Sequence, residues 1–487
     1  MMLVSLYTSR VVLDTLGVED YGIYNVVGGV VAMFGFINGA MSTSTQRYLT
    51  FELGRGDFEC LHKVFSTAVI IHALISLLVV FLAETVGLWF FYHKMVIPEM
   101  RLNAAMWVYQ FSVLATVVMI MSVPYNASII AHERMSAFAY ISVLEVVLRL
   151  LVVYLLQIGH LDKLALYAVL IFMVQLGIRV LYRIYCSRHF EETRFRWLWD
   201  KILFREMLGF AGWNLWGNCA GVAFTQGVNL LLNMFFGPVV NAARGIAVQV
   251  QAAISQFSIN FQTAMNPQIT KSYAVQDYAY MHSLIFRSSK FTFYLLLLFS
   301  LPVMLETEAI LRLWLGTVPE YTVIFIRLML CVTIVDSVAN PLMVSASATG
   351  RVKLYQGVVG GILLSILPLS YIVLKLGGNP AAVFVVHLCV CIIAFIVRLY
   401  IIRPMIKLSL GAYGKHVVVP CLLVGFIALM VPLIVKSFLF EGLWAFLMIC
   451  LICLFSVVLT AYRLGLSRAE REFVQSKLKS VLAKIKS

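Results

Sequence analysis

The feature that most constrains this chain is a series of apolar runs, each about 20 residues long, that recurs along nearly its whole length. A helix of about 20 apolar residues crosses the hydrocarbon core of a bilayer, which is about 30 Å thick. Backbone polar groups in lipid must be paired within the chain, so these runs predict a bundle of membrane-spanning helices. The 487 residues are 62% hydrophobic and 12% charged, with a mean hydropathy of +0.93, which excludes a soluble globular protein. We therefore predict an all-α integral membrane protein.

A layout near the amino end recurs about 220 residues later. Residues 13–66 and 233–286 each contain an apolar run that stops at a glycine, a second helix-length run and a polar loop. Such internal repeats predict two halves built on the same plan. The corresponding residues are Gly17 and Gly237, Asp57 and Asp277, His62 and His282, and, at an offset three residues shorter, Pro124 and Pro341, Ser128 and Ser345, and Arg134 and Arg351.

The apolar runs predict about fourteen transmembrane helices, arranged as six, six and two. The first ends near Gly17 and lacks about a dozen residues relative to its repeat counterpart, so we expect helix 1 to be truncated or the true start to lie upstream. The others are expected at 21–45, 65–92, 105–131, 138–156, 164–186, 208–236, 242–267, 291–315, 321–348, 354–374, 381–402, 417–435 and 443–464. The expected divisions are an N-terminal six-helix lobe (1–186), a basic cytoplasmic connector (187–206), a C-terminal six-helix lobe (207–402), an additional helix pair (403–464) and a basic amphipathic cytoplasmic tail (465–487).

The net charge of +14 lies mainly in loops, so it indicates topology and no nucleic-acid partner. Cytoplasmic loops carry an excess of Lys and Arg. Basic residues follow the even-numbered helices, whereas the loops after the odd-numbered helices contain few Lys or Arg residues. This distribution predicts that both termini are cytoplasmic. Examples are Arg55 after the second helix, Arg134 after the fourth, Arg194 in the connector, Lys271 after the eighth and Arg351 after the tenth.

Amide side chains form stripes on two consecutive helices, 208–236 and 242–267. Amides facing lipid are costly, so they either hold helices together or line a wet cavity. We expect a cavity, because whole stripes are involved, and amides beside aromatic rings match the hydroxyls and ring faces of sugars. The candidate cavity residues on these helices are Asn214, Asn218, Gln226, Asn229, Asn233, Gln256 and Asn260.

Ionisable residues inside the apolar helices are a second signal, because a charge in the membrane is costly and by default functional. Arg10 and Arg244 flank ends expected on the non-cytoplasmic side, where topology does not require basic residues. Arginine binds phosphate oxygens in bidentate fashion, so a cavity with several arginines and few acids favours an anionic substrate. Asp336 is the acidic candidate for the same cavity.

Two further charge sites, Arg149 and Arg179, have local alternatives. Arg149 follows Glu145 by four residues, so a pair within one helix competes with a functional role. Arg179 lies near the cytoplasmic end of its helix and can extend its charge to the surface. Pro124 and Pro341 occupy corresponding helices and are candidate hinges for alternating access, with a static bend as the alternative.

No catalytic constellation is present in the sequence. There is no P-loop, so ATP is not expected to be the direct energy source. The nine cysteines are scattered and read as small buried hydrophobic residues, not as metal ligands or disulfides. His62 and His282 lie in basic loops without ligand spacing. We therefore expect no enzyme, no cofactor and no metal.

Short motifs in both halves resemble polysaccharide-transport proteins, the lipid-linked oligosaccharide flippases of the multidrug/oligosaccharidyl-lipid/polysaccharide exporter superfamily. In the first half these are LGVEDYGIYN at 16–25, TQRYL at 45–49 and FELG at 51–54. In the second half they are FGP at 236–238, NAARG at 241–245, PQI at 267–269 and KSYA at 271–274. The resemblance covers the whole chain.

The resemblance implies two six-helix lobes in a V and a central cavity that opens alternately to each face. It also implies an undecaprenyl-pyrophosphate-linked glycan as substrate, a place in the bacterial inner membrane, and a role in O-antigen, capsule or exopolysaccharide assembly beside glycan-assembly proteins. Two alternatives stay open. One is a cation-coupled multidrug exporter of the same superfamily, which needs cavity carboxylates such as Asp336. The other is a membrane glycan polymerase or ligase.

Overall fold

The computed structural model describes residues 11–12, 15–17, 20, 23–24, 27, 35–94, 97–158, 162–194, 196, 198, 200–315, 318–438, 442–468, 470–472 and 475. Every regular element in that part of the chain is helical. The chain forms two compact units, Met1–Cys219 and Ala220–Ser487. The division lies within one long helix, and the lobe boundaries expected at 186 and 207 stay a prediction.

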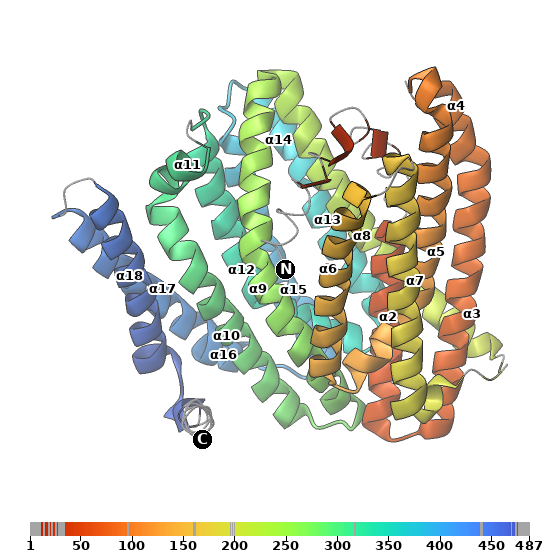
Figure 1. Ribbon diagram of the computed structural model, residues 1–487. Coiled ribbons are helices and arrows are strands. Elements are labelled where there is room, and N and C mark those ends of the chain that lie inside the picture. The colour runs from red at the N-terminus through yellow and green to blue at the C-terminus, as the bar shows by residue number, and fades with distance from the viewer. Residues whose placement is uncertain are drawn as a thin grey trace, which may run out of the picture. The chain divides into compact units, whose positions relative to one another are not determined.

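The first unit is built around α5, which packs against α2, α3, α6 and α7 (Figure 1). Its core includes Val108 and Tyr109 of α5, both almost fully buried. The elements are α2 (Gly35–Arg55), α3 (Phe58–Leu82), η1 (Ala83–Gly87), α4 (Leu88–Lys94), η2 (Glu99–Arg101), α5 (Leu102–Ala131), α6 (Met135–Ile158), α7 (Lys163–His189), η3 (Glu191–Thr193) and the first part of α8 (Lys201–Phe236).

The second unit is built around α12, which packs against α9, α10 and α15, while α17 and α18 pack on each other and on α10. Two apolar clusters fill it, one containing Phe325 of α12 and the other Leu342 of the same helix. The elements are α9 (Pro238–Ala274), α10 (Tyr278–Leu305), α11 (Thr307–Leu315), α12 (Thr322–Ala348), α13 (Val352–Leu364), α14 (Ile366–Lys375), α15 (Ala382–Met405), α16 (Leu410–Tyr413), η4 (Gly414–Val418), α17 (Val419–Lys436), α18 (Leu443–Thr460) and η5 (Ala461–Gly465).

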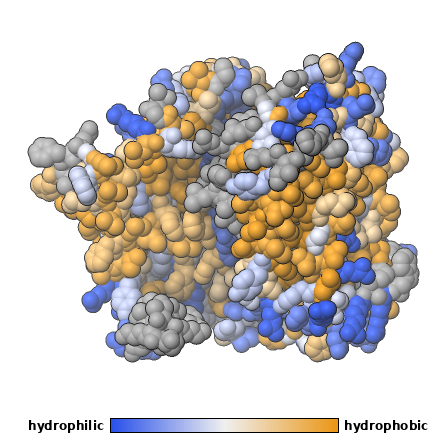
Figure 2. Space-filling view, viewed as in Figure 1, coloured by the Kyte–Doolittle hydropathy of each residue, from blue (hydrophilic) through white to orange (hydrophobic). Residues whose placement is uncertain are grey.

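Eleven helices of the described residues are long and apolar enough to cross a membrane. Two others complete the expected plan: α2, and α9, a helix of 37 residues whose amides make it more polar. The first expected helix lies largely outside the described residues. Hydrophobic residues cover the middle of the helices in Figure 2, and hydrophilic residues gather near their ends. The prediction of an all-α membrane protein with about fourteen helices is confirmed.

The internal repeat is visible in the backbone. Three described positions in the first half adopt positive φ, a conformation that is uncommon outside glycine. Each position in the first half has its counterpart in the second half at the offset found in the sequence. The pairs are Gly17 (φ 80°) and Gly237 (77°), Gly56 (72°) and Gln276 (59°), and Glu133 (59°) and Gly350 (75°).

Helices after the polar loops begin earlier than their apolar runs suggested. We expected helices from 65 and 291, whereas α3 begins at Phe58 and α10 at Tyr278. Asp57 accepts a hydrogen bond from Cys60 N at 3.0 Å, and Asp277 caps α10 in the same way. An N-cap carboxylate satisfies backbone donors that a helix start leaves free, so the polar residues after it can be helical.

The expected helix at 65–92 contains a π-turn, η1, between α3 and α4. The hydroxyl of the buried Tyr109 donates to the carbonyl of Ala83 at 2.7 Å. Gly87 leaves room for it, because a Cβ there would lie 2.1 Å from the Tyr109 hydroxyl. The turn and this tyrosine therefore depend on each other.

Gly87→Ala is expected to destabilise the protein by about 1–3 kcal/mol, because a buried ring must move and its hydrogen bond is strained. The free energy of unfolding in mixed micelles measures this. Gly177→Ala on α7 is the matched control, since its Cβ meets nothing within 4 Å. Tyr109→Phe removes the clashing oxygen, so the double variant should lose less than the sum of the single variants. Additive losses would contradict this account.

The segment after α18 is fastened to α10 by a buried ion pair. Lys290 Nζ lies 2.7 Å from Glu470 Oε2, and both side chains are less than a tenth exposed. The same carboxylate accepts from Ser467 N at 2.8 Å, which forms half of a capping box. Tyr294 donates its hydroxyl to the carbonyl of Gly465 at 3.2 Å. These contacts hold the start of the tail against the second unit.

Candidate functional site

The candidate site lies where α8 and α9 are joined by a single residue. Gly237 adopts φ 77°, and its amide donates to the carbonyl of Asn233 at 2.9 Å. Pro238 then opens α9, where its missing amide hydrogen is not needed. Because the turn is this short, Arg244 in the second turn of α9 meets residues in the last third of α8.

Arg244 is 8% exposed and its guanidinium is held by neutral acceptors. Nη1 donates to Asn229 Oδ1 at 3.1 Å, and Nη2 donates to the carbonyl of Thr225 at 2.7 Å. Nε is buried without a hydrogen-bond partner among the described residues. No described carboxylate forms an ion pair with Arg244. A buried positive charge with a spare donor is thus presented at the junction of the two helices.

His387 of α15 also belongs to this site. Its ring lies 4.5 Å from the ring of Phe224, and the His387 side chain is close enough to Arg244 for the two to influence each other electrostatically. His387 was not among the residues chosen from the sequence. The signal was available, since it is an ionisable residue in the middle of the otherwise apolar run 381–402.

The α8 stripe divides between the two units. In the first unit, Asn214 is buried and donates to the carbonyl of Phe210 at 3.1 Å, and the exposed Asn218 approaches Gly39 of α2. In the second unit, Gln226 and Asn233 are exposed, and Asn229 is half-buried against Arg244.

The α9 stripe serves two purposes. Gln256 and Asn260 are exposed and bonded to each other, with 3.1 Å between Nε2 and Oδ1. Gln251 instead donates to the hydroxyl of Thr333 on α12 at 2.7 Å, which ties α9 to α12. Exposed amides are too costly to face lipid, so they indicate a wet surface.

Asp336 does not join Arg244. It lies on α12 and its Oδ1 is 3.3 Å from Nη1 of Arg398 on α15. The side chain of Arg398 is 11% exposed and that of Asp336 is 46% exposed. Arg398 was not among the residues chosen from the sequence, although it is an ionisable residue within the apolar run 381–402.

The remaining predicted charge sites lie apart from this group or outside the described residues. Arg149 donates to Glu145 at 2.6 Å, as its local alternative proposed. Arg179 is half-buried and interacts with the charge of Arg183. Arg10 lies outside the described residues. Pro124 and Pro341 are buried inside continuous helices, α5 and α12, and their role as hinges stays a prediction.

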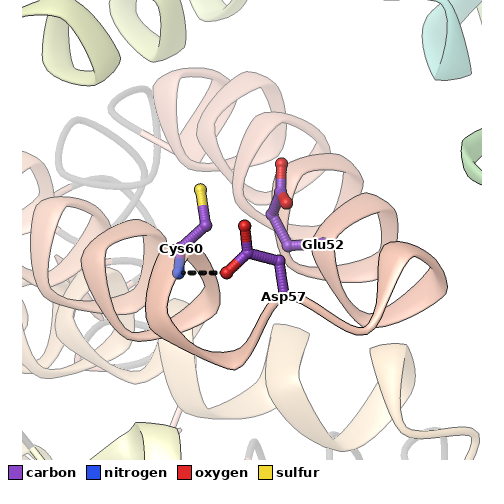
Figure 3. Close-up of side chains that lie close together, drawn as sticks. All are labelled: Glu52, Asp57 and Cys60. Carbon is purple, nitrogen blue, oxygen red and sulfur yellow. Dashed lines mark hydrogen bonds between the residues drawn. The ribbon is translucent and has the colours of Figure 1, made fainter.

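Among the residues that the structure describes, one cluster of metal-ligand types occurs, at the junction of α2 and α3. Donor atoms of Glu52, Asp57 and Cys60 lie within 4.8 Å of one another (Figure 3). One Asp57 oxygen already caps α3, as Asp277 does in the other half. Arg55 Nη1 lies 3.7 Å from Glu52 Oε2 and opposes a cation there. The cluster is therefore explained by capping and ion pairing.

Solved transporter structures share this fold. An outward-facing multidrug resistance MATE family transporter of the MOP superfamily matches with a TM-score of 0.71 at 12% identity, over 83% of this chain and 92% of that chain. A MOP superfamily transporter from Pyrococcus furiosus, in which the reverse polarity of the binding pocket suggests a different function, matches with a TM-score of 0.70 at 12% identity, over 83% and 92%.

A MATE transporter in complex with Rb⁺ matches with a TM-score of 0.68 at 13% identity, over 84% of this chain and 94% of that chain. No protein-family model and no curated protein matches the sequence. At these identities the likeness is one of fold. The chain has the fold of the MATE transporters of the MOP superfamily.

Proposed function

We propose that this protein is a flippase that moves an undecaprenyl-pyrophosphate-linked oligosaccharide across the bacterial inner membrane by alternating access. Both termini are then cytoplasmic, as the distribution of basic residues indicates. The product serves O-antigen, capsule or exopolysaccharide assembly, with glycan-assembly proteins as partners and the bilayer holding the lipid tail.

The observation that carries the proposal is the environment of Arg244. Two of its three nitrogens donate to neutral groups, the buried Nε has no partner among the described residues, and no described carboxylate neutralises the charge. A permanent guanidinium charge in such a site attracts an anion, and a pyrophosphate offers several acceptors to it. The site therefore suits the charged part of the substrate.

Exposed amides elsewhere on α8 and α9 suit the sugar part. Gln226, Asn233, Gln256 and Asn260 are exposed and offer both donors and acceptors. Sugar hydroxyls also need both donors and acceptors. A lipid-linked glycan combines a pyrophosphate, hydroxyl-rich rings and a lipid tail. These parts match the charge of Arg244, the exposed amides and the bilayer, respectively.

The second candidate is a cation-coupled multidrug exporter, favoured by the fold shared with multidrug MATE transporters and with one bound to Rb⁺. It needs a membrane carboxylate free to bind a cation. Asp336 is paired with Arg398, which already supplies the positive charge. A glycan polymerase or ligase has less support, because the structures that share this fold are transporters.

Complementation of a flippase-deficient strain tests the proposal. The chain and its Arg10→Ala and Arg244→Ala variants are expressed at matched membrane levels, and surface glycan is measured. We expect the chain to restore glycan and Arg244→Ala to lose about 10-fold to 100-fold in rate, because a charged hydrogen-bonding group is worth about 1.5–3 kcal/mol. Arg312→Ala is the control, since its pair with Glu308 is exposed.

Normal glycan in both arginine variants would remove Arg10 and Arg244 from the mechanism. Absence of rescue by the chain itself, with drug resistance conferred instead, would favour the exporter. Arg244→Lys is expected to give a level of surface glycan between those of the unaltered chain and Arg244→Ala. Lysine keeps the positive charge but loses the bidentate geometry.

A further inference from the structure

A pocket of about 770 Å³ opens at the end of α15, away from the Arg244 site. It is formed by the last turn of α15, the loop after it and the start of α16. The lining residues are Tyr400, Arg403, Pro404, Lys407, Leu408, Ser409, Leu410 and Gly411.

The charge of this pocket has one sign. Arg403 and Lys407 are its only ionisable groups besides Tyr400, and neither forms an ion pair with a described carboxylate. Lys407 lies with Nζ 5.1 Å from the ring centre of Tyr278, which orients the ammonium without neutralising it. Two cations that share an open pocket favour an anionic ligand.

The position of Lys407 is held by the loop. It adopts φ 55°, and Leu408 N behind it donates to the carbonyl of Arg403 at 3.0 Å, which closes the helix. Leu408 is 2% exposed and anchors the loop in the core. His282 Nε2 lies 2.8 Å from the carbonyl of Ile406 and ties the same turn to α10. The pocket floor is therefore built from fixed backbone.

An apolar stripe leads away from the pocket along α15. Tyr400 is 63% exposed, Ile396 48% and Ile393 53%, at helical spacing above Arg403. These residues lie within a candidate membrane span, so in a bilayer they lie at the depth of the acyl chains. A ligand with an anionic head and an apolar tail matches both parts of this surface, whereas a free anion matches only the first.

We propose that this pocket binds the phosphate headgroup of an anionic phospholipid, with the acyl chains along the Ile393–Tyr400 stripe. Arg403 and Lys407 contact the phosphate. By the topology expected from the basic loops, the lipid belongs to the cytoplasmic leaflet, where anionic lipids attract Lys and Arg. The site is independent of the transported substrate.

A lipid titration of the delipidated protein in detergent micelles tests this, with the melting temperature as readout. Dioleoyl phosphatidylglycerol is compared with dioleoyl phosphatidylcholine and with inorganic phosphate. The variant is Arg403→Gln with Lys407→Asn, in which asparagine tolerates the positive φ and so keeps the turn. The charge-matched control is Arg287→Gln with Arg351→Gln, two exposed residues outside the pocket.

We expect phosphatidylglycerol to raise the melting temperature of the protein and the control, and to bind the pocket variant about 30-fold more weakly, since each basic residue near an anionic surface contributes about 1 kcal/mol. Phosphatidylcholine and phosphate should have little effect. Equal binding by the pocket variant, or an equal effect of phosphatidylcholine, would overturn the proposal. An equal effect of phosphate alone would show a site for free anions. Size-exclusion profiles of the lipid-free variants report folding separately.

Discussion

Replacing Glu470 with alanine is expected to cost about 3–5 kcal/mol, because it leaves the buried ammonium of Lys290 without its counter-charge. The tail should also detach, since Glu470 completes the capping box with Ser467. Unfolding in mixed micelles measures the first effect, and the rate of tryptic cleavage at Arg468 and Arg471 measures the second.

Glu472→Ala is the matched control, because Glu472 is an exposed acid in the same segment. It should behave as the unaltered protein does. Lys290→Met with Glu470→Leu should recover most of the stability, since an apolar pair of similar volume avoids the unpaired charge. If Glu470→Ala and Glu472→Ala unfold alike, the ion pair does not hold the tail.

The same pair predicts a dependence on pH. Burial raises the pKa of Glu470, but hydrogen bonds from Lys290 and Ser467 lower it, and the net shift is downward from 4.5. A group with a depressed pKa in the folded state stabilises that state above its ordinary pKa and loses this contribution as the pH falls. The free energy of unfolding should therefore fall as the pH drops below about 4.5 in the protein, and this part of the fall should be missing in Glu470→Ala.

Asp336→Ala is expected to destabilise the second unit by about 3 kcal/mol, because Arg398 is left buried without its counter-charge. The value lies at the lower end of the usual range since the Asp336 side chain is 46% exposed. The free energy of unfolding in mixed micelles measures it. Asp336→Ala with Arg398→Met should be less destabilised than Asp336→Ala alone, whereas Glu308→Ala, which breaks an exposed pair, should cost at most about 1 kcal/mol.

Asp336→Asn separates the two transport hypotheses. The amide keeps an acceptor for Arg398 and loses the negative charge. A flippase that uses Asp336 only to pair with Arg398 should keep most of its surface glycan, measured at matched membrane levels. Loss of transport with unchanged stability would instead assign Asp336 to cation coupling, as the exporter hypothesis requires.

Much of the fold could be predicted from the sequence, for a physical reason. Lipid leaves no solvent for backbone groups, so each long apolar run has only a helix available to it. The repeat was also readable, since Gly17 and Gly237 both mark positions of positive φ. Helix starts were less accurate, because Asp57 and Asp277 extend α3 and α10 into polar sequence.

The candidate site was predicted in part. Asn229 and Arg244 were both chosen from the sequence, and the one-residue turn at Gly237 brings them into contact. His387 could have been found, since it is ionisable and lies in an apolar run, but nothing local says which helix faces α9. Which side chains of other helices a residue contacts depends on how the helices pack. The hydrophobic periodicity of a single helix does not show this.

The sequence by itself therefore determined that this chain is a helical membrane protein with an internal repeat. The length of an apolar run and the position of a glycine each act on the local backbone, so both can be read without knowing the packing. Only the tertiary structure decided which charges are free and which are paired. Asp336 meets Arg398 across 62 residues and Lys290 meets Glu470 across 180, so neither pairing has a local signature. Arg244 differs from these charges in having only neutral partners, and that difference comes from the packing of α8 and α9.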